Sequence, residues 1–507
     1  ARPRIRLVGL DAARGFALLG MIAVHTLPAQ NSLTAQPTLT WTLFAGNSAA
    51  LFALLAGVSL ALITGREAPH TGSRWRLSAT SLAVRALLMR EPPRISGHAP
   101  GVPVVRDAEE TLAQAIDAVS RLDESCLFIQ GPPGSGKTYT SSHIIVELLR
   151  QGRRVGVAAN SHKAIHNLLA AVERRAVETG FSFRGIKKST ANEETWFGGR
   201  FVEDVTDNGR VDPEADLIAG TAWLFAREEF DQKLDFLFVD EAGQVSLANM
   251  VAMGLAARNL VLVGDQMQLA QPIQGVHPGE SGLSVLDYLL EGAPTIPPER
   301  GIFLGTTWRM HDEVCRFISE VVYDGRLHPE PGTRNQRVLL GADAHPDLAP
   351  TGIRFVPVEH RGCSQKSGEE GRVIREIYES LLLQRFRDRN GAERPFGMDD
   401  ILVVSPYNVQ VNHLRALLPA GARVGTVDKF QGQEAEVVLV SMATSGAEDL
   451  PRDIEFLYSR NRLNVALSRA RSLALVAASP RLLEIPCATV EQMRLVNTLC
   501  RVADEES

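Results

Sequence analysis

Cysteine is scarce in this 507-residue chain, and the few cysteines present do not form a recognisable site. The five lie far apart, with no C-x-x-C pair and no histidine at metal-ligand spacing. We therefore predict no metal cluster and no disulfide scaffold, and the composition fits a reducing, cytoplasmic environment. The remaining composition, with 45% hydrophobic and 22% charged residues, is that of ordinary globular domains, and the length suggests about three of them.

Charged residues are absent from one long stretch, residues 15–65, which contains no Asp, Glu, Lys or Arg. Two apolar cores lie within it, at 15–27 and 39–64, and the second is long enough to cross a bilayer, which takes about 20 residues. We predict an α-helical transmembrane hairpin within residues 1–89. Its arginine-rich flanks would both face the cytoplasm. The hairpin would then anchor the rest of the chain at the inner face of the cytoplasmic membrane. A signal peptide and a buried helical hairpin of a soluble protein are the alternative interpretations.

The sequence of this stretch is RIRLVGLDAARGFALLGMIAVH followed by NSAALFALLAGVSLAL. It resembles the start of bacterial membrane proteins related to heparan-alpha-glucosaminide N-acetyltransferase, over about residues 3–88. Members of that group have many more transmembrane helices than this stretch can supply. We therefore expect no acyltransferase activity and carry over no catalytic residue.

Proline and glycine are frequent at the next junction, which indicates a linker at 90–106. Beyond it, short apolar segments alternate with helical patterns, which predicts parallel sheets covered on both faces. The expected strands form two sets, at 126–130, 154–159, 215–221, 234–240 and 259–265, and at 302–308, 353–358, 401–405, 423–428, 437–441 and 473–478. We therefore expect an α/β protein with a first domain at 107–300, interrupted by a polar insertion at about 173–213, and a second domain at 301–507.

The segment that follows the first expected strand fits G-x-x-x-x-G-K-[ST], the phosphate-binding P-loop, and it precedes an expected helix. The expected nucleotide site comprises Gly131, Pro132, Pro133, Gly134, Ser135, Gly136, Lys137, Thr138 and the next residue, Tyr139. Backbone N–H groups of such a loop surround the phosphates, Lys137 would reach the terminal phosphates, and Thr138 would bind Mg²⁺. The motif predicts ATP and Mg²⁺ as ligands.

A carboxylate pair, Asp240 and Glu241, ends the expected strand at 234–240. In a parallel sheet this position faces the same crevice as the P-loop. We predict that Asp240 binds Mg²⁺ together with Thr138, and that Glu241 orients or deprotonates the attacking water. The alternative is that the pair only caps the next helix.

Five further motifs follow in order: DEAGQ (240–244), GDQMQLAQP (264–272), WRMHDEV (308–314), TVDKFQGQEAEVVLVS (426–441) and RNRLNVALSRAR (460–471). With them the chain resembles superfamily 1 helicases over about residues 90–505. The resemblance is to the branch that contains the nonsense-mediated-decay helicase, the replication nuclease-helicases and bacterial proteins that join a RecB-like nuclease domain to such a helicase. It implies two tandem RecA-like domains and ATP-driven movement along single-stranded DNA or RNA, 5′ to 3′.

The resemblance also implies roles at matching positions. Gln114 would read the adenine edge, and Gln268 would sense the γ-phosphate. Trp308, in place of the usual tyrosine, would stack on the base, and Glu434 would contact the ribose.

Two arginines from the second domain, Arg309 and Arg469, match the arginine fingers of this group. Charge develops on the γ-phosphate oxygens during hydrolysis, and guanidinium groups brought across a cleft stabilise it only when the domains close. Domain closure would thereby be coupled to hydrolysis. Taken singly, each arginine could instead be a surface ion-pair partner.

Nucleic acid is expected to cross the top of both domains, held by hydroxyls and backbone N–H groups that do not read sequence. The expected contacts are Asn160, Ser161, His162, Lys163, Thr221, Ser405, Pro406, Tyr407 and Thr426.

The chain departs from its relatives in two ways. It has no nuclease motif, so we predict no DNA cleavage, although a nuclease could act in trans. The segment 90–130 is also too short for the small barrel that precedes the P-loop in strongly unwinding relatives. We predict an ATP-dependent helicase or translocase. The alternatives are a membrane-anchored protein or acyltransferase fragment with a passenger ATPase, and an ATP-driven clamp that does not unwind.

Overall fold

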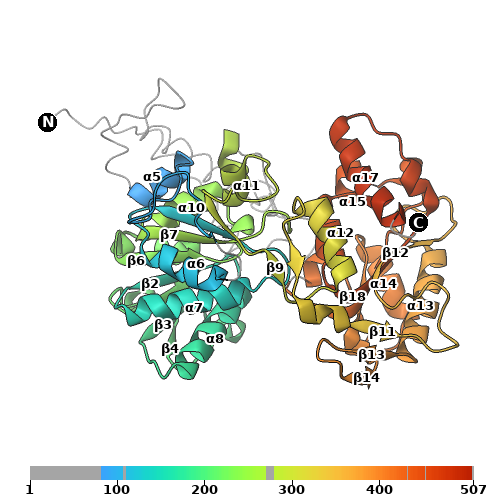
Figure 1. Cartoon of the computed structure of the whole chain (residues 1–507), viewed down its shortest axis with the longest axis horizontal. Coiled ribbons are helices and arrows are strands. Elements are labelled where there is room, and N and C mark those ends of the chain that lie inside the picture. The colour runs from blue at the N-terminus through green and yellow to red at the C-terminus, as the bar shows by residue number, and fades with distance from the viewer. Residues whose placement is uncertain (1–80, 107–109, 270–278, 431, 452, 505–507) are drawn as a thin grey trace, which may run out of the picture.

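The computed structural model describes residues 81–106, 110–269, 279–430, 432–451 and 453–504. Two parallel β-sheets form the centres of two α/β units in these residues, and Figure 1 shows the units side by side. The predicted α/β class with two parallel-sheet domains is confirmed. The predicted membrane hairpin lies, up to residue 80, outside the described residues; no helix in the described part of the chain is long and apolar enough to span a bilayer.

The first sheet has eight strands in the order β4-β3-β5-β2-β6-β7-β1-β8, and every neighbouring pair is parallel. Its strands are β1 (Cys126–Gln130), β2 (Val155–Ala158), β3 (Gly185–Lys188), β4 (Val202–Val205), β5 (Leu217–Gly220), β6 (Leu234–Val239), β7 (Ala257–Gly264) and β8 (Gly301–Phe303). Successive side chains of a strand point to opposite faces, so Leu127 and Ile129 enter one core and Phe128 the other.

Helices cover both faces of this sheet. The core that contains Leu127 is closed by α6 (Thr111–Ser120), α7 (Lys137–Arg150) and α8 (His162–Glu178). The opposite core is closed by α5 (Leu82–Leu88), α9 (Ala222–Phe225), α10 (Leu247–Gly254) and α11 (Val285–Leu290). Both faces of the sheet are therefore shielded from solvent, as the continuous apolar strands predict.

Two predicted boundaries of the first domain differ from the structure. The segment 173–213 is not a separate insertion, because β3 and β4 extend the sheet in parallel beyond β5. Their four-residue length and polar flanks conceal them in the sequence. The boundary after residue 300 also falls too early, because β8 pairs with β1 in the first sheet.

The helix α5 corrects the predicted extent of the membrane segment. Residues up to 89 were expected to belong to the hairpin, yet Ala83, Val84 and Leu87 are buried in the core of the first domain. The expected linker also packs on that domain: Arg90 lies over the Tyr288 ring at 3.9 Å, and its Nε donates to the Tyr288 carbonyl. α5 has six apolar residues around Arg85, and a basic segment separates it from the uncharged stretch 15–65, so the end of the membrane segment was placed too late.

The second sheet has five parallel strands in the order β12-β18-β17-β15-β16. They are β12 (Gly352–Pro357), β15 (Ile401–Val404), β16 (Arg423–Gly425), β17 (Ala435–Ser441) and β18 (Ala470–Ala478). One face is covered by α12 (Asp312–Val322), α15 (Ile454–Leu457), α16 (Arg460–Leu467) and α17 (Val490–Asp504), and the other by α13 (Gly368–Leu382) and α14 (Asn408–Leu417).

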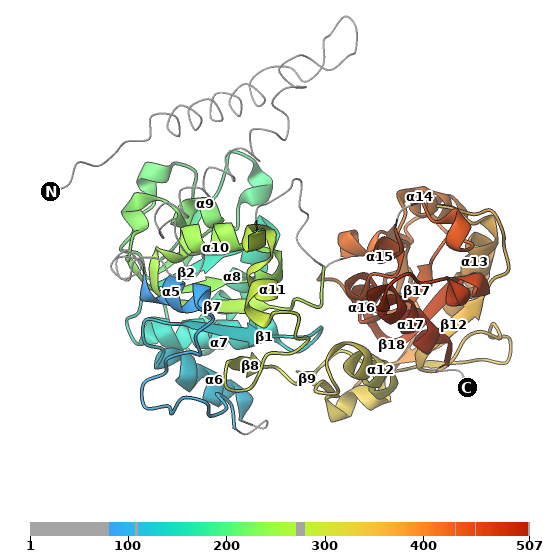
Figure 2. The same ribbon diagram turned by 90° about the horizontal axis from the view of Figure 1, so that it is seen from above.

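Short strands complete the second unit. β9 (Thr306–Thr307) pairs with β10 (His328–Pro329), and β11 (Arg337–Leu339), β13 (Arg385–Arg387) and β14 (Glu393–Pro395) form a small antiparallel sheet. Figure 2 shows the chain passing from one unit to the other at β8 and β9. The segment that joins the domains therefore starts from the strand next to β1, which carries the P-loop.

Candidate nucleotide and nucleic-acid site

A cleft of about 620 Å³ lies between the two domains. The first domain contributes the P-loop, the start of α8 and the end of β6, and the second contributes loops that follow β16 and precede β18. Its lining includes Lys137, Thr138, Tyr139, Asp240, Glu241, Gln268, Arg309 and Arg469. The structure thus brings together every residue for which the sequence predicts a role at the phosphates.

The P-loop lies against the segment that links the domains. Thr307 Oγ1 donates to the Pro133 carbonyl at 3.0 Å, and the Trp308 N–H donates to the Gly134 carbonyl at 2.9 Å. A Cβ on Gly134 would lie 2.6 Å from the Cβ of Arg309, and its φ of +73° also favours glycine. This close approach places Arg309 at the P-loop.

Two side chains of the P-loop bear on phosphate binding. Lys137 Nζ donates to the Gly131 carbonyl at 2.6 Å, and the Ser135 hydroxyl is buried without a hydrogen-bond partner among the described residues. Buried polar groups are normally paired, because each unpaired group loses its bond to water. The loop therefore offers donors to an anion at the N-terminus of α7, where the helix dipole also favours negative charge.

Asp240 and Glu241 lie at the carboxyl end of β6, as predicted. Burial, and then the neighbouring charge of Glu241, raise the pKa of Asp240 to about 7, while Lys137 lowers it in part. Glu241 has a left-handed backbone, with φ of +50°, which is uncommon for a residue other than glycine. Such strain concentrates at functional sites, and here it turns Glu241 from the strand into the cleft lining.

Gln268 is part of a buried hydrogen-bond network that crosses the domain boundary. Its Nε2 donates to Asp265 Oδ2 at 3.0 Å, and the same oxygen accepts from the Tyr323 hydroxyl at 2.6 Å. Asn464 Nδ2 lies 3.0 Å from the Tyr323 hydroxyl and donates to the Met267 carbonyl at 2.7 Å. Tyr323 and Asn464 belong to the second domain, so the first-domain loop that carries Gln268 is hydrogen-bonded to the second domain as well.

A second asparagine strengthens this link. Asn461 Nδ2 donates to the carbonyls of Gln266 and Gln268, at 2.9 and 2.6 Å. The sequence analysis did not single out Asn461, Asn464 or Tyr323. Both asparagines lie inside the motif at 460–471, which the sequence analysis did identify. The backbone loop that they bind lies almost 200 residues earlier, and a local motif does not indicate such a distant partner.

Arg309 is paired in this structure. Its Nε donates to Glu434 Oε2 at 2.5 Å and its Nη1 to the Ser468 carbonyl at 3.0 Å. Glu434 also accepts from Arg471. Burial alone would raise the pKa of Glu434, but Arg309 and Arg471 hold it below the usual value. Glu434, predicted to contact a ribose, here positions two arginines.

Arg469 is held differently. It is 3% exposed, its Nη1 donates to the Gln433 carbonyl at 3.3 Å, and its Nε and Nη2 have no partner among the described residues. Burial, and then the charge of Arg309, lower the pKa of Arg469. A buried cation with free donors that lines a cleft is arranged to meet an anion.

The residues predicted to hold the base are placed less uniformly. Trp308 and Tyr139 are 53% and 60% exposed, so both rings are accessible, and Trp308 is not a core residue. Gln114 does not line the cleft; its Oε1 accepts from the Arg106 N–H at 2.8 Å. The structure therefore groups the phosphate residues more tightly than the base residues.

The predicted nucleic-acid contacts divide between the domains. Ser161 caps α8 through a 3.2 Å bond from the Ala164 N–H, Lys163 lines the cleft, and Thr221 occupies the position before α9 without a side-chain cap bond. His162 begins α8, and Thr426 is half-buried between β16 and the next turn.

The prediction fails for two side chains in the second domain. Ser405 and Tyr407 are 0% and 5% exposed, and Thr444 Oγ1 lies 3.4 Å from the Tyr407 hydroxyl. Only Pro406 between them is partly exposed. The loop turns inward because Tyr407 packs in the second-domain core, so Ser405 and Tyr407 cannot present their side chains to a bound strand.

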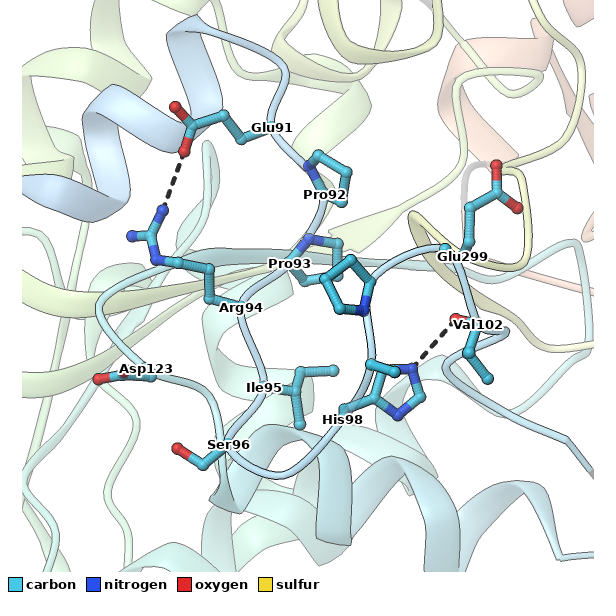
Figure 3. A pocket seen from close by; sticks show the side chains of 13 residues that line it. Glu91, Pro92, Pro93, Arg94, Ile95, Ser96, His98, Val102, Asp123 and Glu299 are labelled. Carbon is cyan, nitrogen blue, oxygen red and sulfur yellow. Dashed lines mark hydrogen bonds and ion pairs between the residues drawn. The ribbon is translucent and has the colours of Figure 1, made fainter.

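A separate pocket lies in the segment that precedes α6 (Figure 3). Residues 91–102 form most of it, with Asp123 and Glu299 at its edge. Arg94 pairs with Glu91 at 2.9 Å, and His98 Nε2 contacts the Val102 carbonyl at 3.0 Å. Arg94 and Glu91 are thus paired within the segment, and the pocket contains none of the predicted site residues.

Comparison with known protein families gives three matches. Two family models, each described as "AAA domain", match residues 109–280 and 283–481. A third, described as "Heparan-alpha-glucosaminide N-acetyltransferase, catalytic", matches residues 6–91. Both resemblances that the sequence indicates are thereby supported, and the third match includes α5, which packs in the first domain.

Several curated relatives with similar sequences are named helicases. The DNA replication ATP-dependent helicase/nuclease JHS1 of Arabidopsis thaliana is 26% identical, over 70% of this chain and 27% of its own length. The DNA polymerase alpha-associated DNA helicase A of Schizosaccharomyces pombe is 24% identical, over 68% of this chain and 59% of its own length. The Regulator of nonsense transcripts 1 homolog of Drosophila melanogaster is 25% identical, over 70% and 33%. The chain is similar to superfamily 1 helicases, and spans between about a quarter and three fifths of these relatives.

Solved helicase structures are also found. An Arterivirus nonstructural protein 10 (helicase) with DNA aligns with a TM-score of 0.38 and 16% identity, covering 74% of this chain and 62% of that one. The DUF1998 helicase MrfA bound to DNA and AMPPNP aligns with a TM-score of 0.43 and 10% identity, covering 81% and 54%.

Proposed function

We propose that this chain is an ATP-dependent helicase or translocase that moves on single-stranded DNA or RNA. One observation carries the proposal: a single interdomain cleft is lined by Lys137, Asp240 and Glu241 from one domain and by Arg309 and Arg469 from the other. Phosphoryl transfer needs this combination, a phosphate cradle, carboxylates and cations facing the terminal phosphate. The helicase relatives support the same activity.

The phosphates would lie on the P-loop. Backbone N–H groups and Lys137 would bind them, and Lys137 would exchange the Gly131 carbonyl for a phosphate oxygen. Glu241 would orient the attacking water and accept its proton, since it lines the cleft beside Asp240.

The arrangement also fits a divalent metal. Thr138 and Asp240 line the same cleft, and the carboxylate of Asp240 carries no ion pair in the described part of the chain. We propose that they hold Mg²⁺, which on binding neutralises charge on the phosphates. In its absence, the repulsion between Asp240 and a phosphate would oppose nucleotide binding.

Hydrolysis would be coupled to domain movement through the second-domain arginines. Arg469 has two free donors, and Arg309 sits at the P-loop, so closing the cleft brings both cations onto the γ-phosphate. Opening would remove them after hydrolysis. Repeated closing and opening shifts the grip of the two domains on a strand that crosses them, with 5′ to 3′ direction expected from the resemblance.

The first test is ATP hydrolysis by the full chain, with and without single-stranded DNA or RNA, beside Lys137→Ala. Nucleic acid should stimulate hydrolysis strongly, and Lys137→Ala should abolish it. A shortened chain should retain α5 and begin at or before Ser81, because deletion through residue 90 would remove part of the first-domain core.

A strand-displacement assay separates the motor from a clamp. A motor releases the labelled strand of a partial duplex when ATP is added, whereas a clamp hydrolyses ATP and releases no strand. Substrates with a 5′ or a 3′ overhang test the expected direction.

Membrane attachment through the N-terminal region is a further proposal, favoured by the match at residues 6–91. Because α5 belongs to the first domain, any spanning segment must end before Leu82. Detergent dependence tests this: the full chain should be monodisperse only with detergent, while a chain that begins at Ser81 should need none.

A further inference from the structure

The tryptophans in the described part of the chain are unusually exposed. Trp196, Trp223 and Trp308 lie in the described residues, and their exposed fractions are 49%, 71% and 53%. Tryptophan usually buries most of its large apolar surface. Trp308 lies beside the P-loop, but the other two are outside the cleft and outside the helicase motifs.

Trp196 and Trp223 follow neighbouring strands of the first sheet. Trp223 lies in α9, directly after β5, and Trp196 lies in the loop that follows β3. Because β3 and β5 are parallel, both segments leave the sheet at its carboxyl edge. β2 flanks β5 on its other side and leads into residues 160–163, the predicted nucleic-acid loop.

The loop that carries Trp196 is held by contacts with side chains of β3 and α8. Trp196 Nε1 donates to the Thr190 carbonyl at 2.9 Å, and the preceding carbonyl, that of Thr195, accepts from the fully buried Lys187. His166 Nε2 contacts the same carbonyl at 3.2 Å. The indole is therefore held before any ligand binds, so little side-chain entropy is lost on binding.

Lys187 also connects this loop to the predicted nucleic-acid site. Its Nζ lies 3.3 Å from Nδ1 of His162, the first residue of α8, and 3.7 Å from Asp204 Oδ1. Burial, and then the charge of Lys187, lower the pKa of His162, so this imidazole is neutral near pH 7. The contacts among Lys187, His162 and Asp204 thus hold the start of α8 in place and add no exposed positive charge.

Charge near Trp196 favours contact with bases over contact with phosphates. Glu193 and Glu194 belong to the turn Glu193–Thr195 that leads into Trp196, and both are exposed, so a phosphate would be repelled there. Lys163, in the first turn of α8, supplies the positive charge that a nucleic-acid backbone needs.

We propose that Trp196 and Trp223 form a base-stacking platform for single-stranded nucleic acid at the carboxyl edge of the first sheet. The proposal rests on the proposed function and adds its base contacts. Every base has a flat face, so stacking holds a strand without reading its sequence, as a motor requires. Phosphates would be held beside the platform by the loop at 160–163.

The test measures binding of the full-length chain to a labelled oligothymidine strand and to an abasic strand of equal length, by fluorescence anisotropy. The wild type should bind oligothymidine more tightly. Trp196→Ala with Trp223→Ala should weaken oligothymidine binding about tenfold or more, since stacking of each base contributes substantially, and should leave abasic binding nearly unchanged.

Two variants control the interpretation. Trp196→Phe with Trp223→Phe keeps aromatic faces and should retain most of the preference for bases. Leu383→Ala removes another strongly exposed apolar side chain, 80% exposed in the second domain, and should change neither affinity. Lys163→Ala should reduce the dependence of affinity on salt, whereas the tryptophan variants should not.

The outcomes are distinct. Equal weakening for both strands, or no weakening, overturns the platform while leaving a nucleic-acid-binding protein. If the wild type binds neither strand, the proposed function fails and the platform fails with it.

Discussion

The two walls of the cleft are built in different ways. The first-domain wall presents the P-loop, including Lys137, at the carboxyl end of β1 and two carboxylates at the end of β6. The second-domain wall includes two arginines that differ from one another: Arg309 is paired with Glu434, whereas Nε and Nη2 of Arg469 have no partner among the described residues. We propose that Lys137 exchanges only the Gly131 carbonyl of its own loop for a phosphate, whereas Arg309 must leave Glu434 across the second domain before both arginines can act.

The largest effect should come from Arg469. Arg469→Ala should lower single-turnover ATP hydrolysis about 10³-fold, the loss typical for an arginine finger, with little change in nucleotide affinity. Thermal stability should not fall, because two of its donors have no partner to lose. Arg469→Lys should restore little, since an ammonium lacks the planar fork of donors.

Arg501→Ala is the matched control for Arg469→Ala. This arginine lies on the surface of the same domain and pairs with Glu320 at 2.9 Å, so hydrolysis should be unaffected. Unimpaired hydrolysis in Arg469→Ala would contradict the view that the second wall supplies the reacting cation.

Glu434→Gln tests the pairing of Arg309. Losing the carboxylate loosens both Arg309 and Arg471, so kcat should fall about tenfold, the loss expected for one misplaced charged hydrogen bond. The ratio of rates with ATP and 2′-deoxyATP should stay constant. A changed ratio would show instead that Glu434 contacts the ribose.

Tyr323→Phe tests the link between the walls. Removing the hydroxyl takes a donor from Asp265, which also holds Gln268, and should lower kcat about threefold to tenfold with KM for ATP unchanged. Tyr458→Phe is the control: this buried hydroxyl donates to the Leu482 carbonyl at 2.7 Å, away from the cleft. Equal kcat losses in the two variants would assign Tyr323 a structural role only.

The smallest effect should come from Ser135→Ala. The Ser135 hydroxyl is buried and unpaired in the described structure, yet backbone N–H groups and Lys137 supply most phosphate contacts. Steady-state hydrolysis should change by less than about threefold. A loss near that of Arg469→Ala would mean that side chains, rather than backbone, dominate the first wall.

The strands could be predicted because their apolar runs are continuous, as burial on both sheet faces requires. β1 begins and ends at the predicted residues, 126 and 130, and the P-loop follows it. β3 and β4 could not be predicted, because four-residue strands with lysine or acidic side chains lack such a run. α5 was assigned to the membrane segment because it has only seven residues, and six apolar side chains around Arg85 are too few to distinguish a core helix from the flank of a membrane span.

The candidate site shows the same division. Motif spacing predicted Lys137, Asp240 and Glu241, because their motifs are local in sequence and lie at the ends of strands, and the resemblance to superfamily 1 helicases implied Arg469; all four line the cleft. The burial of Tyr407 and the pairing of Arg309 with Glu434 depend on contacts between distant segments, which a local pattern does not encode.

The sequence by itself determined the class of fold, the phosphate-binding chemistry and the residues that approach the cleft, because hydrophobic periodicity and motif spacing are properties of short segments. Only the tertiary structure decided which arginine of the cleft is paired among the described residues, and that Asn464 and Tyr323 tie the Gln268 loop to the second domain. Those outcomes follow from which distant segments pack together, and burial then sets the strength of each charge and hydrogen bond.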